Sequence, residues 1–296
     1  MSEPTGPDPQ APESPPAGPP VPPGAPGPPE PPRPSDPEGP SPEDFQEARA
    51  LLRTGVALLP VMAVTLVLGL DMTVRDAVFA SLLLGTLPLL TMAQLPLLSH
   101  GRVERIPAYT GSAVMLTVLA SLGLLLGHFG PGLEAMGLGL EFSAREWRTV
   151  GVVLAAVVLL GVGFHFAEEW FGLEESPLLV ELIPRTAKEK GLFALLSLAA
   201  GVGEEVVYRG YLLALLGPIF SGPWVAAATS TLAFAVLHAY QGAVGIVRSG
   251  LLGFLFAAAF IMTGSLWPVI LVHAGVDLLS GLVLGPRMLE RNEKQV

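Results

Sequence analysis

The chain of 296 residues contains no cysteine. This absence excludes disulfide bonds, thiolate zinc sites and a cysteine nucleophile. Charge is scarce as well, since 14% of the residues are charged, against about 25% in a typical soluble domain. No run of lysines and arginines marks a nucleic-acid surface, so we expect no nucleic-acid partner.

The first 44 residues differ from the rest in composition. Residues 1–42 hold 19 of the 30 prolines, and residues 1–44 hold eight of the 26 acids but only one base, Arg33. Such a segment buries too little apolar surface to order its backbone. It predicts a disordered, acidic, proline-rich tail at residues 1–44. The spacing Pro15-Pro16-Ala-Gly-Pro19 would suit a docking partner, although a solvated tail explains it equally simply.

Apolar segments dominate the remainder. Hydrophobic residues make up 51% of the chain, and the mean hydropathy is +0.57. Many runs approach the roughly 20 residues that a helix needs to cross a bilayer. We therefore expect an all-α polytopic membrane protein with about eight transmembrane helices, at residues 51–70, 74–98, 109–129, 150–166, 191–216, 224–238, 243–263 and 266–284.

Smaller features divide these segments. Pro88 and Pro96 should bend the second one. Residues 133–147 are too polar to span and are expected at the membrane interface. A charged connector should run through residues 168–190. Tight turns at Gly217-Pro218, Ser221–Pro223, Tyr240–Gly242 and Gly264-Ser265 should place the last four helices in one antiparallel bundle.

Basic residues indicate the orientation in the membrane. If eight segments cross, the bases on one side are Arg49, Arg53, Arg102, Arg105, Arg185, Lys188, Lys190, Arg287, Arg291 and Lys294. The other side holds Arg75, Arg145 and Arg148. The positive-inside rule then places both termini in the cytoplasm. We expect an integral, multi-pass protein, in the inner (plasma) membrane if the source is bacterial.

Two adjacent acids and an arginine interrupt the segment at 191–216. A charge at mid-membrane costs about 2.5–3.5 kcal/mol on insertion scales, so such residues usually have a function. Glu205 and Arg209 are four residues apart and can pair along one helix face. Glu204 lies about 100° around the helix and is left free to act. The alternative is a Glu–Arg pair that only holds helices together.

Two histidines on later segments complete the ionisable set. His238 shares a helix face with Phe234, although a position at the membrane–water boundary would also explain it. His273 and Asp277 are again four residues apart, so the carboxylate can fix the tautomer of the imidazole; a packing pair is the alternative. Gly275 between them should leave room for another helix or a substrate.

These side chains suffice to activate a water molecule and to stabilise an oxyanion. No serine lies in a nucleophile-elbow pattern, and no His-Glu-x-x-His zinc motif is present. The order Glu204-Glu205-x-x-x-Arg209, Phe234-x-x-x-His238 and His273-x-x-x-Asp277 resembles the three-motif signature of the CPBP (ABI) family, the CAAX prenyl protease 2-like (Rce1-type) intramembrane proteases. The resemblance covers roughly residues 190–285.

The resemblance implies a glutamate-dependent intramembrane endopeptidase that acts on a membrane protein or peptide. Its protease core would occupy residues 191–285, after N-terminal helices and a connector at 45–190 and before a C-terminal tail at 286–296. Glu204 and His238 would activate water, Glu205 and Arg209 would support that site, and His273 and Asp277 would line the oxyanion side.

The last of these positions departs from the family pattern. Rce1-type enzymes have asparagine there, a hydrogen-bond donor, whereas Asp277 donates only when protonated. Asp277 is therefore either protonated or an orienting partner of His273. The resemblance implies no cofactor; a divalent metal such as zinc, held by Glu204, His238, His273 and Asp277, is the alternative.

Other functions fit parts of the pattern. A non-catalytic immunity or scaffold protein could use the proline-rich tail. A proton-coupled transporter could use the Glu and His residues as a relay, although no inverted repeat is detectable. His165, Glu168 and Glu169 have the spacing of a metal site, but boundary residues facing water explain them better.

Overall fold

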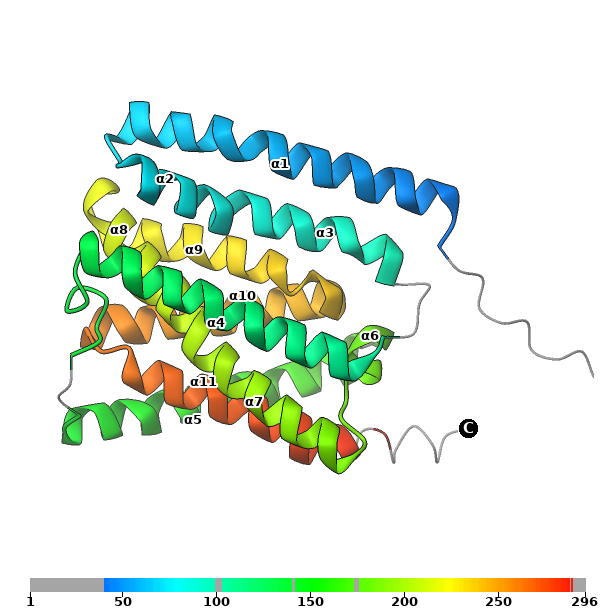
Figure 1. Cartoon of the computed structure of the whole chain (residues 1–296). Coiled ribbons are helices and arrows are strands. Elements are labelled where there is room, and N and C mark those ends of the chain that lie inside the picture. The colour runs from blue at the N-terminus through cyan, green and yellow to red at the C-terminus, as the bar shows by residue number, and fades with distance from the viewer. Residues whose placement is uncertain (1–39, 99–102, 140–141, 173–175, 288, 290–296) are drawn as a thin grey trace, which may run out of the picture. The chain divides into compact units, whose positions relative to one another are not determined.

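A computed structural model describes residues 40–98, 103–139, 142–172, 176–287 and 289. The predicted disordered tail lies outside the described residues up to position 39. The described elements are all helical (Figure 1): α1 (Pro42–Leu70), α2 (Val74–Ser81), η1 (Leu82–Thr86), α3 (Leu87–Leu98), α4 (Arg105–Phe129), α5 (Ala144–Phe171), α6 (Pro177–Glu181), α7 (Ala187–Glu204), η2 (Glu205–Tyr211), α8 (Leu212–Ile219), α9 (Pro223–Leu237), η3 (Ala239–Gln241), α10 (Gly242–Thr263), α11 (Trp267–Leu279) and η4 (Ser280–Leu284).

Within the described ranges, seven helical stretches are long and apolar enough to cross a membrane. They correspond to seven of the eight expected segments, which confirms an all-α polytopic membrane protein. The remaining one, α9, has 15 residues and is therefore about 22 Å long. It is shorter than the bilayer core of about 30 Å, and it packs against α8, α10 and α3.

Polar residues begin several of the long helices, and glycines end two of them. Capping boxes open α1, α5 and α7, formed by Ser41 with Asp44, Ser143 with Glu146 and Thr186 with Glu189. In each, the hydroxyl and the carboxylate satisfy backbone N–H groups that the first helical turn leaves unpaired. Left-handed residues end α5 and α10, at Gly172 and Gly264, where glycine carries no steric cost.

Aromatic residues mark both ends of α5. Trp147 is 63% exposed near its start, and Trp170 is 85% exposed near its end. The 23-residue separation corresponds to about 34 Å along a helix. Tryptophans gather at the two membrane–water interfaces, so α5 has the length and the anchors of a spanning helix.

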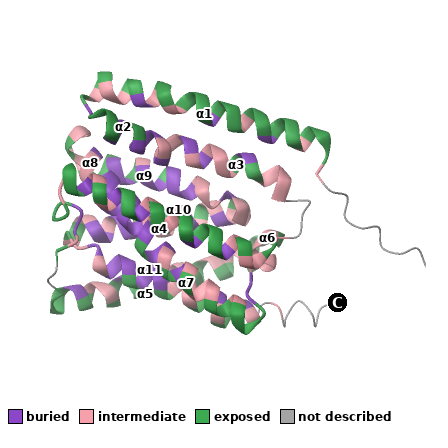
Figure 2. Cartoon of the chain, in the orientation of Figure 1, coloured by how far each residue is buried: buried purple, intermediate pink, exposed green. Residues whose placement is uncertain are grey.

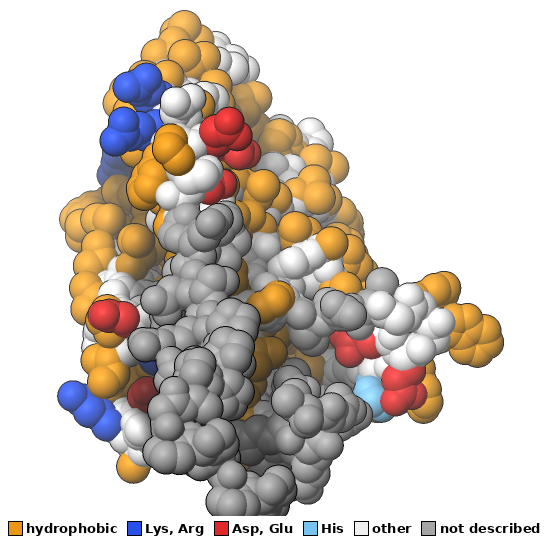
Figure 3. All heavy atoms as spheres, turned by 90° about the vertical axis from the view of Figure 1, so that its right-hand side faces the viewer, with side chains coloured by type: hydrophobic (Ala, Val, Ile, Leu, Met, Phe, Trp, Pro, Cys, Tyr) orange, Lys and Arg blue, Asp and Glu red, His pale blue; other side chains and the backbone are white. Residues whose placement is uncertain are grey.

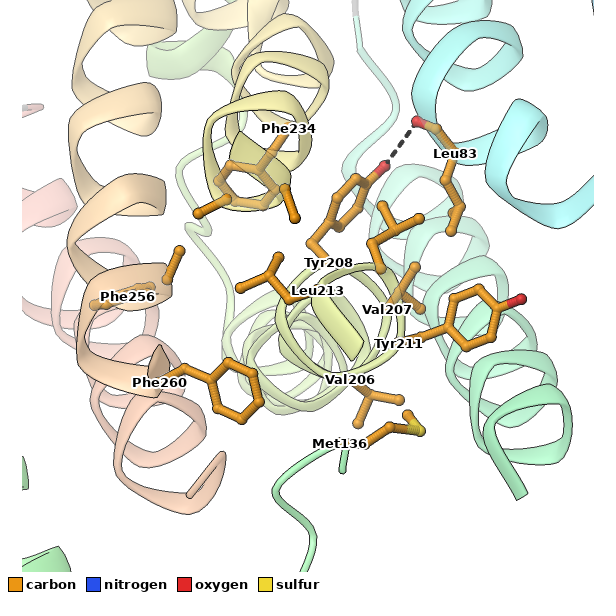
Figure 4. Close-up of a cluster of buried hydrophobic side chains, with 14 of the residues drawn as sticks. Leu83, Met136, Val206, Val207, Tyr208, Tyr211, Leu213, Phe234, Phe256 and Phe260 are labelled. Atoms are coloured by element: carbon orange, nitrogen blue, oxygen red, sulfur yellow. Dashed lines mark hydrogen bonds between the residues drawn. The ribbon is translucent and has the colours of Figure 1, made fainter. Parts of the chain in front are cut away.

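Burial separates peripheral from central helices. Most residues of α1 are exposed, and many exposed side chains of α1 and α5 are apolar and would face lipid, whereas η2 and the start of α8 are enclosed (Figure 2). Figure 4 looks along this central helix and shows Phe234, Phe256 and Phe260 on one side, and Val207 and Tyr211 on the other. The motif with the two acids therefore lies in the core.

Charged side chains gather at one end of the bundle. This is the end at which α1 begins and η4 ends, and Figure 3 shows it with acidic and basic side chains among hydrophobic ones. Exposed Arg53, Arg185 and Lys188 belong to the helix ends here. The arrangement agrees with the expected distribution of bases.

Several local expectations need correction. Residues 133–147 do not form one segment: turns continue to Gly137, and α5 begins at Ala144. The connector is shorter than expected, because α5 extends to Phe171 and α7 begins at Ala187 behind its capping box. Pro218 lies inside α8, so no turn occurs at Gly217-Pro218; the chain reverses at residues 220–222, where a turn was expected at Ser221–Pro223.

Candidate active site

A π-helical segment carries the acidic motif. All seven residues of η2 are buried, from Glu205 to Tyr211. We expected a regular α-helix here, but the hydrogen bonds widen to the i→i+5 pattern, which occurs frequently at functional sites. The expected pair survives the change, because Arg209 Nη1 donates to Glu205 Oε1 at 2.9 Å.

Arg209 is held on three sides. Its side chain is 1% exposed and that of Glu205 is 0% exposed. The guanidinium carbon lies 4.2 Å from the centroid of the Phe234 ring, which is the geometry of a cation–π contact. A Cβ atom added at Gly253 would come within 2.8 Å of Nη2. Glycine in α10 therefore leaves the space that the guanidinium occupies.

His273 joins α11 to the acids of α7 and η2. Its Nδ1 donates to Glu205 Oε1 at 2.7 Å. Its Nε2 lies 3.6 Å from Glu204 Oε2 and 3.8 Å from Asp277 Oδ2. The expected proximity of His273 and Asp277 is therefore present, and the same imidazole reaches both glutamates.

Close packing of two helices allows this contact. A Cβ atom at Gly201 would lie 2.7 Å from Cβ of Ala274, so α7 and α11 approach where both residues are small. Gly275 was the glycine expected to admit a neighbour, but nothing lies within 4 Å of a Cβ built there. The helix contact is made one residue earlier, beside the catalytic candidate His273.

His238 closes the helix α9. Its Nδ1 lies 2.9 Å from the carbonyl oxygen of Phe234. A carbonyl oxygen only accepts, so Nδ1 carries the hydrogen, and Nε2 of the neutral ring keeps a lone pair. The Phe234 ring lies 4.6 Å from the ring of His238 and 6.5 Å from the ring of His273. His238 therefore belongs to the same cluster.

Glu204 differs from its neighbour in access. Its side chain is 17% exposed, whereas Glu205 is enclosed. Glu204 Oε2, Glu205 Oε2 and Arg209 Nη2 have no hydrogen-bond partner in the described part of the chain. Buried polar atoms are rarely left unpaired, so these atoms are where a water molecule or a substrate group would bind.

No direct hydrogen bond or ion pair between Glu204 and His238 occurs among the described residues. Catalytic hydrogen bonds often tighten only when substrate is bound, so their joint action on one water stays a prediction.

The candidate metal ligands are Glu204, His238, His273 and Asp277. Among the described residues, these four included, no group of three or more His, Asp or Glu side chains has the arrangement of a metal site.

The side chains of the second candidate metal site, at the end of α5, do not converge on one point. His165 Nε2 lies 3.5 Å from Glu169 Oε1, with both side chains more than half exposed. Glu168 turns instead toward Arg248, at 3.8 Å. The three residues lie at the end of α5, as expected of boundary residues facing water.

Sequence reasoning missed a buried acid that stabilises the motif from outside. Asp76 at the start of α2 is 4% exposed and accepts a hydrogen bond from Tyr211 Oη at 2.9 Å. Tyr211 is the last residue of η2, so this bond ties the π-helical segment to α2. The only sequence signal was the position of Asp76 next to Arg75, and Arg75 was used solely to assign the orientation in the membrane.

Comparison with known proteins identifies the part of the chain that carries the site. Residues 187–279 match the model of the family described as type II CAAX prenyl endopeptidase Rce1-like. No curated protein and no solved structure gave a significant match. The matched range runs from the first residue of α7 to the last residue of α11, and it contains all seven residues named in the three motifs. Residues 187–279 are therefore similar to the Rce1-like type II CAAX prenyl endopeptidases, a protease family.

Proposed function

We propose that the chain is a glutamate-dependent intramembrane endopeptidase that cleaves a peptide bond of a membrane protein or membrane-bound peptide. The observation that carries the proposal is the convergence of Glu204, Glu205, Arg209 and His273 on one cluster inside the helix bundle, next to His238 and Asp277. Isolated ionisable groups inside a membrane protein are costly. A cluster with accessible and inaccessible acids has the parts of an acid–base site.

Glu204 is the general base of this mechanism. It is the more exposed of the two glutamates, and one of its oxygens has no partner. A water molecule near Glu204 and His238 loses a proton to Glu204, and its oxygen forms a bond to the scissile carbonyl carbon. The electron pair of the carbonyl double bond moves to the oxygen. The C–N bond then breaks, and the proton held by Glu204 passes to the leaving amine.

His273 stabilises the oxyanion. With Nδ1 donating to Glu205, a protonated His273 presents a second N–H at Nε2. That hydrogen lies between Glu204 and Asp277, where a substrate oxygen can replace them. Asp277 acts as an orienting carboxylate for His273 in this scheme, and Glu205 with Arg209 keeps the imidazole in place.

The test is a Glu204→Gln variant of the purified protein, with Glu169→Gln as its matched control. Loss of a general base costs about 10²–10⁴ in rate, so Glu204→Gln should lose cleavage while remaining folded. The side chain of Glu169 is 62% exposed and has no part in the proposed mechanism, so the Glu169→Gln variant should cleave normally. Membrane proteomics of the two variants would reveal the substrate as fragments that vanish with Glu204→Gln alone.

The contrary result is equally informative. Normal cleavage by a folded Glu204→Gln protein would overturn the mechanism. An unchanged cellular phenotype with Glu204→Gln, lost on deletion of residues 1–42, would favour the scaffold function. Proton uptake by proteoliposomes that depends on a transported solute, and not on cleavage of a peptide, would favour a transporter.

Metal dependence has its own prediction. Because the ligand set is not arranged as a metal site, activity should survive a strong chelator. Elemental analysis of the active protein should find less than one equivalent of zinc. Inactivation by the chelator with recovery on adding zinc would instead assign Glu204, His238, His273 and Asp277 as ligands.

A further inference from the structure

A tyrosine stands next to the cluster without a role in the mechanism above. Tyr240 follows His238 in the turn η3, and the two rings stack at 6.1 Å with an angle of 30° between their planes. The side chain is half-buried. The His238 ring in turn lies 4.6 Å from the ring of Phe234, and the Phe234 ring lies 6.5 Å from that of His273. The phenol therefore lies beside His238 at the edge of the cluster.

The hydroxyl of Tyr240 keeps its own hydrogen free to donate. Gln241 Nε2 donates to Tyr240 Oη at 3.1 Å, so this bond uses an oxygen lone pair of the phenol. The amide orientation is fixed in turn, because Arg248 Nη2 donates to Gln241 Oε1 at 3.3 Å. Arg248 also pairs with Glu168 at 3.8 Å. Glu168 on α5 and Arg248 on α10 thus fix the side-chain amide of Gln241, and this amide orients the hydroxyl of Tyr240.

The backbone of the turn is fixed as well. Ser176 Oγ donates to the carbonyl oxygen of Tyr240 at 2.9 Å. The N–H of Gln241 donates to the carbonyl oxygen of His238 at 2.9 Å. Gly242 leaves the turn at φ +78°, a conformation that favours glycine. A phenol on such a turn is positioned before substrate arrives, as electrostatic catalysis requires.

The proposed reaction needs a second donor. An oxyanion is stabilised by hydrogen-bond donors aimed at the developing charge, and ionised carboxylates only accept. Arg209 Nη1 already donates to Glu205, and His238 Nδ1 to Phe234. Arg209 Nη2 has no hydrogen-bond partner among the described residues, but the side chain that carries it is 1% exposed. The mechanism above therefore assigns one donor to the oxyanion, His273 Nε2, which is flanked by acids at 3.6 and 3.8 Å.

We propose that Tyr240 is a further catalytic residue, whose phenolic O–H donates a hydrogen bond to the oxyanion opposite His273. This inference rests on the proposed function. As water adds to the carbonyl carbon, the carbonyl oxygen gains the electron pair and accepts hydrogen bonds from Tyr240 and His273. Neither donor loses its proton, and both bonds weaken when the C–N bond breaks and the carbonyl re-forms.

The experiment compares Tyr240→Phe with Tyr109→Phe and Glu204→Gln. The probe is an internally quenched transmembrane peptide, taken from a protein whose fragments vanish in Glu204→Gln membranes. Tyr240→Phe keeps the ring that stacks on His238 and removes the hydroxyl, which is the proposed donor and also the acceptor of the Gln241 hydrogen bond. Loss of one oxyanion donor costs about 10²–10³ in kcat, so we expect that loss with KM changed less than about threefold.

The controls separate a catalytic from a structural role. Tyr109 Oη donates to the carbonyl oxygen of Leu182 at 2.6 Å, away from the site, so Tyr109→Phe should retain kcat. Gln241→Leu should lower kcat less than Tyr240→Phe does, because the phenol remains but loses its orienting amide. The thermal midpoint of Tyr240→Phe should stay near that of the wild type.

Two results would overturn the inference. A wild-type kcat for Tyr240→Phe, with Glu204→Gln inactive, removes Tyr240 from the reaction and leaves the proposed function intact. A raised KM at unchanged kcat would make Tyr240 a binding residue only. Cleavage by Glu204→Gln would instead contradict the proposed function itself.

Discussion

Glu205 accepts hydrogen bonds from two cations through one oxygen. Arg209 Nη1 and His273 Nδ1 both reach Oε1, at 2.9 and 2.7 Å. Removing one partner of a buried ion pair leaves an uncompensated charge and costs more than the pair contributes. The enclosed acid is therefore suited to hold cations in place, and the neighbouring Glu204 is the acid able to meet a substrate.

The space for Arg209 depends on a single glycine. A Cβ atom at position 253 would lie 2.8 Å from Arg209 Nη2 and 3.0 Å from Phe234 Cδ1. Overpacking of this kind costs about 1–3 kcal/mol, so Gly253→Ala should lower the thermal midpoint in detergent and reduce cleavage at least tenfold.

Gly161→Ala is the matched control for that substitution. Gly161 also lies inside a long helix, but nothing lies within 4 Å of a Cβ built there. This variant should keep wild-type cleavage and a thermal midpoint at or above that of the wild type. Equal behaviour of the two variants would show that the guanidinium does not need the space at position 253.

Local spacing predicted half of the site at this scale. Pairs four residues apart on one helix, Glu205 with Arg209 and His273 with Asp277, follow from helix geometry alone. The contact of His273 with Glu205 spans 68 residues and depends on the approach of Gly201 to Ala274. A glycine in an apolar run does not reveal in the sequence which helix it admits.

At the scale of elements, side chains from other helices support the π-helical segment η2. Ser230 Oγ on α9 donates to the carbonyl oxygen of Tyr208 at 2.8 Å. Tyr211 Oη donates to Asp76 on α2 at 2.9 Å. A regular α-helix was the natural expectation from residues 191–216, because the partners that satisfy this widened turn come from 22 and 135 residues away.

Ser230→Ala tests whether that support matters. The substitution leaves the buried Tyr208 carbonyl without its side-chain donor, at a cost of about 1–3 kcal/mol. If the bond holds η2 in its widened turn, Glu205 and Arg209 shift with it, and cleavage should fall together with stability. Unfolding in detergent and cleavage of the quenched peptide measure the two effects.

The neighbouring hydroxyl provides the comparison. Thr229 Oγ1 donates to the carbonyl oxygen of Val225 within α9 itself, at 2.9 Å. Thr229→Ala removes a hydroxyl of similar geometry that supports no other helix, so its stability should change by about 0.5 kcal/mol or less. A loss as large in Thr229→Ala as in Ser230→Ala would contradict a specific role in supporting η2.

At the scale of the whole molecule, hydropathy predicted the spanning helices but not their inner arrangement. Seven long apolar stretches satisfy the length that a bilayer imposes. The short helix α9 packs on one side against α3, α8 and α10, while Val225 and Leu232 on its other side are more than half exposed. The hydropathy of the sequence identifies the helices that face lipid, whereas the position of the short helix α9 depends on packing between segments that are distant in the sequence.

The absence of cysteine makes the orientation directly testable. Single cysteines can be introduced at exposed positions without removing native ones: Glu47→Cys in α1, Glu134→Cys after α4, Lys188→Cys in α7 and Arg287→Cys after η4. If both termini are cytoplasmic, a membrane-impermeant maleimide should label only Glu134→Cys in intact cells. After lysis it should label all four. Val158→Cys, on an exposed apolar face of α5, should resist labelling in both cases because lipid covers it.

Labelling of Arg287→Cys shows whether α9 carries the chain back across the membrane. The chain reverses on both sides of this helix (Figure 1), so α9 must return it toward the end where α1 begins. Arg287→Cys should therefore behave like Glu47→Cys, although α9 is too short to cross lipid alone. Labelling of Arg287→Cys in intact cells together with Glu134→Cys would place the end of η4 outside. It would also remove the even number of passes on which the positive-inside assignment depends.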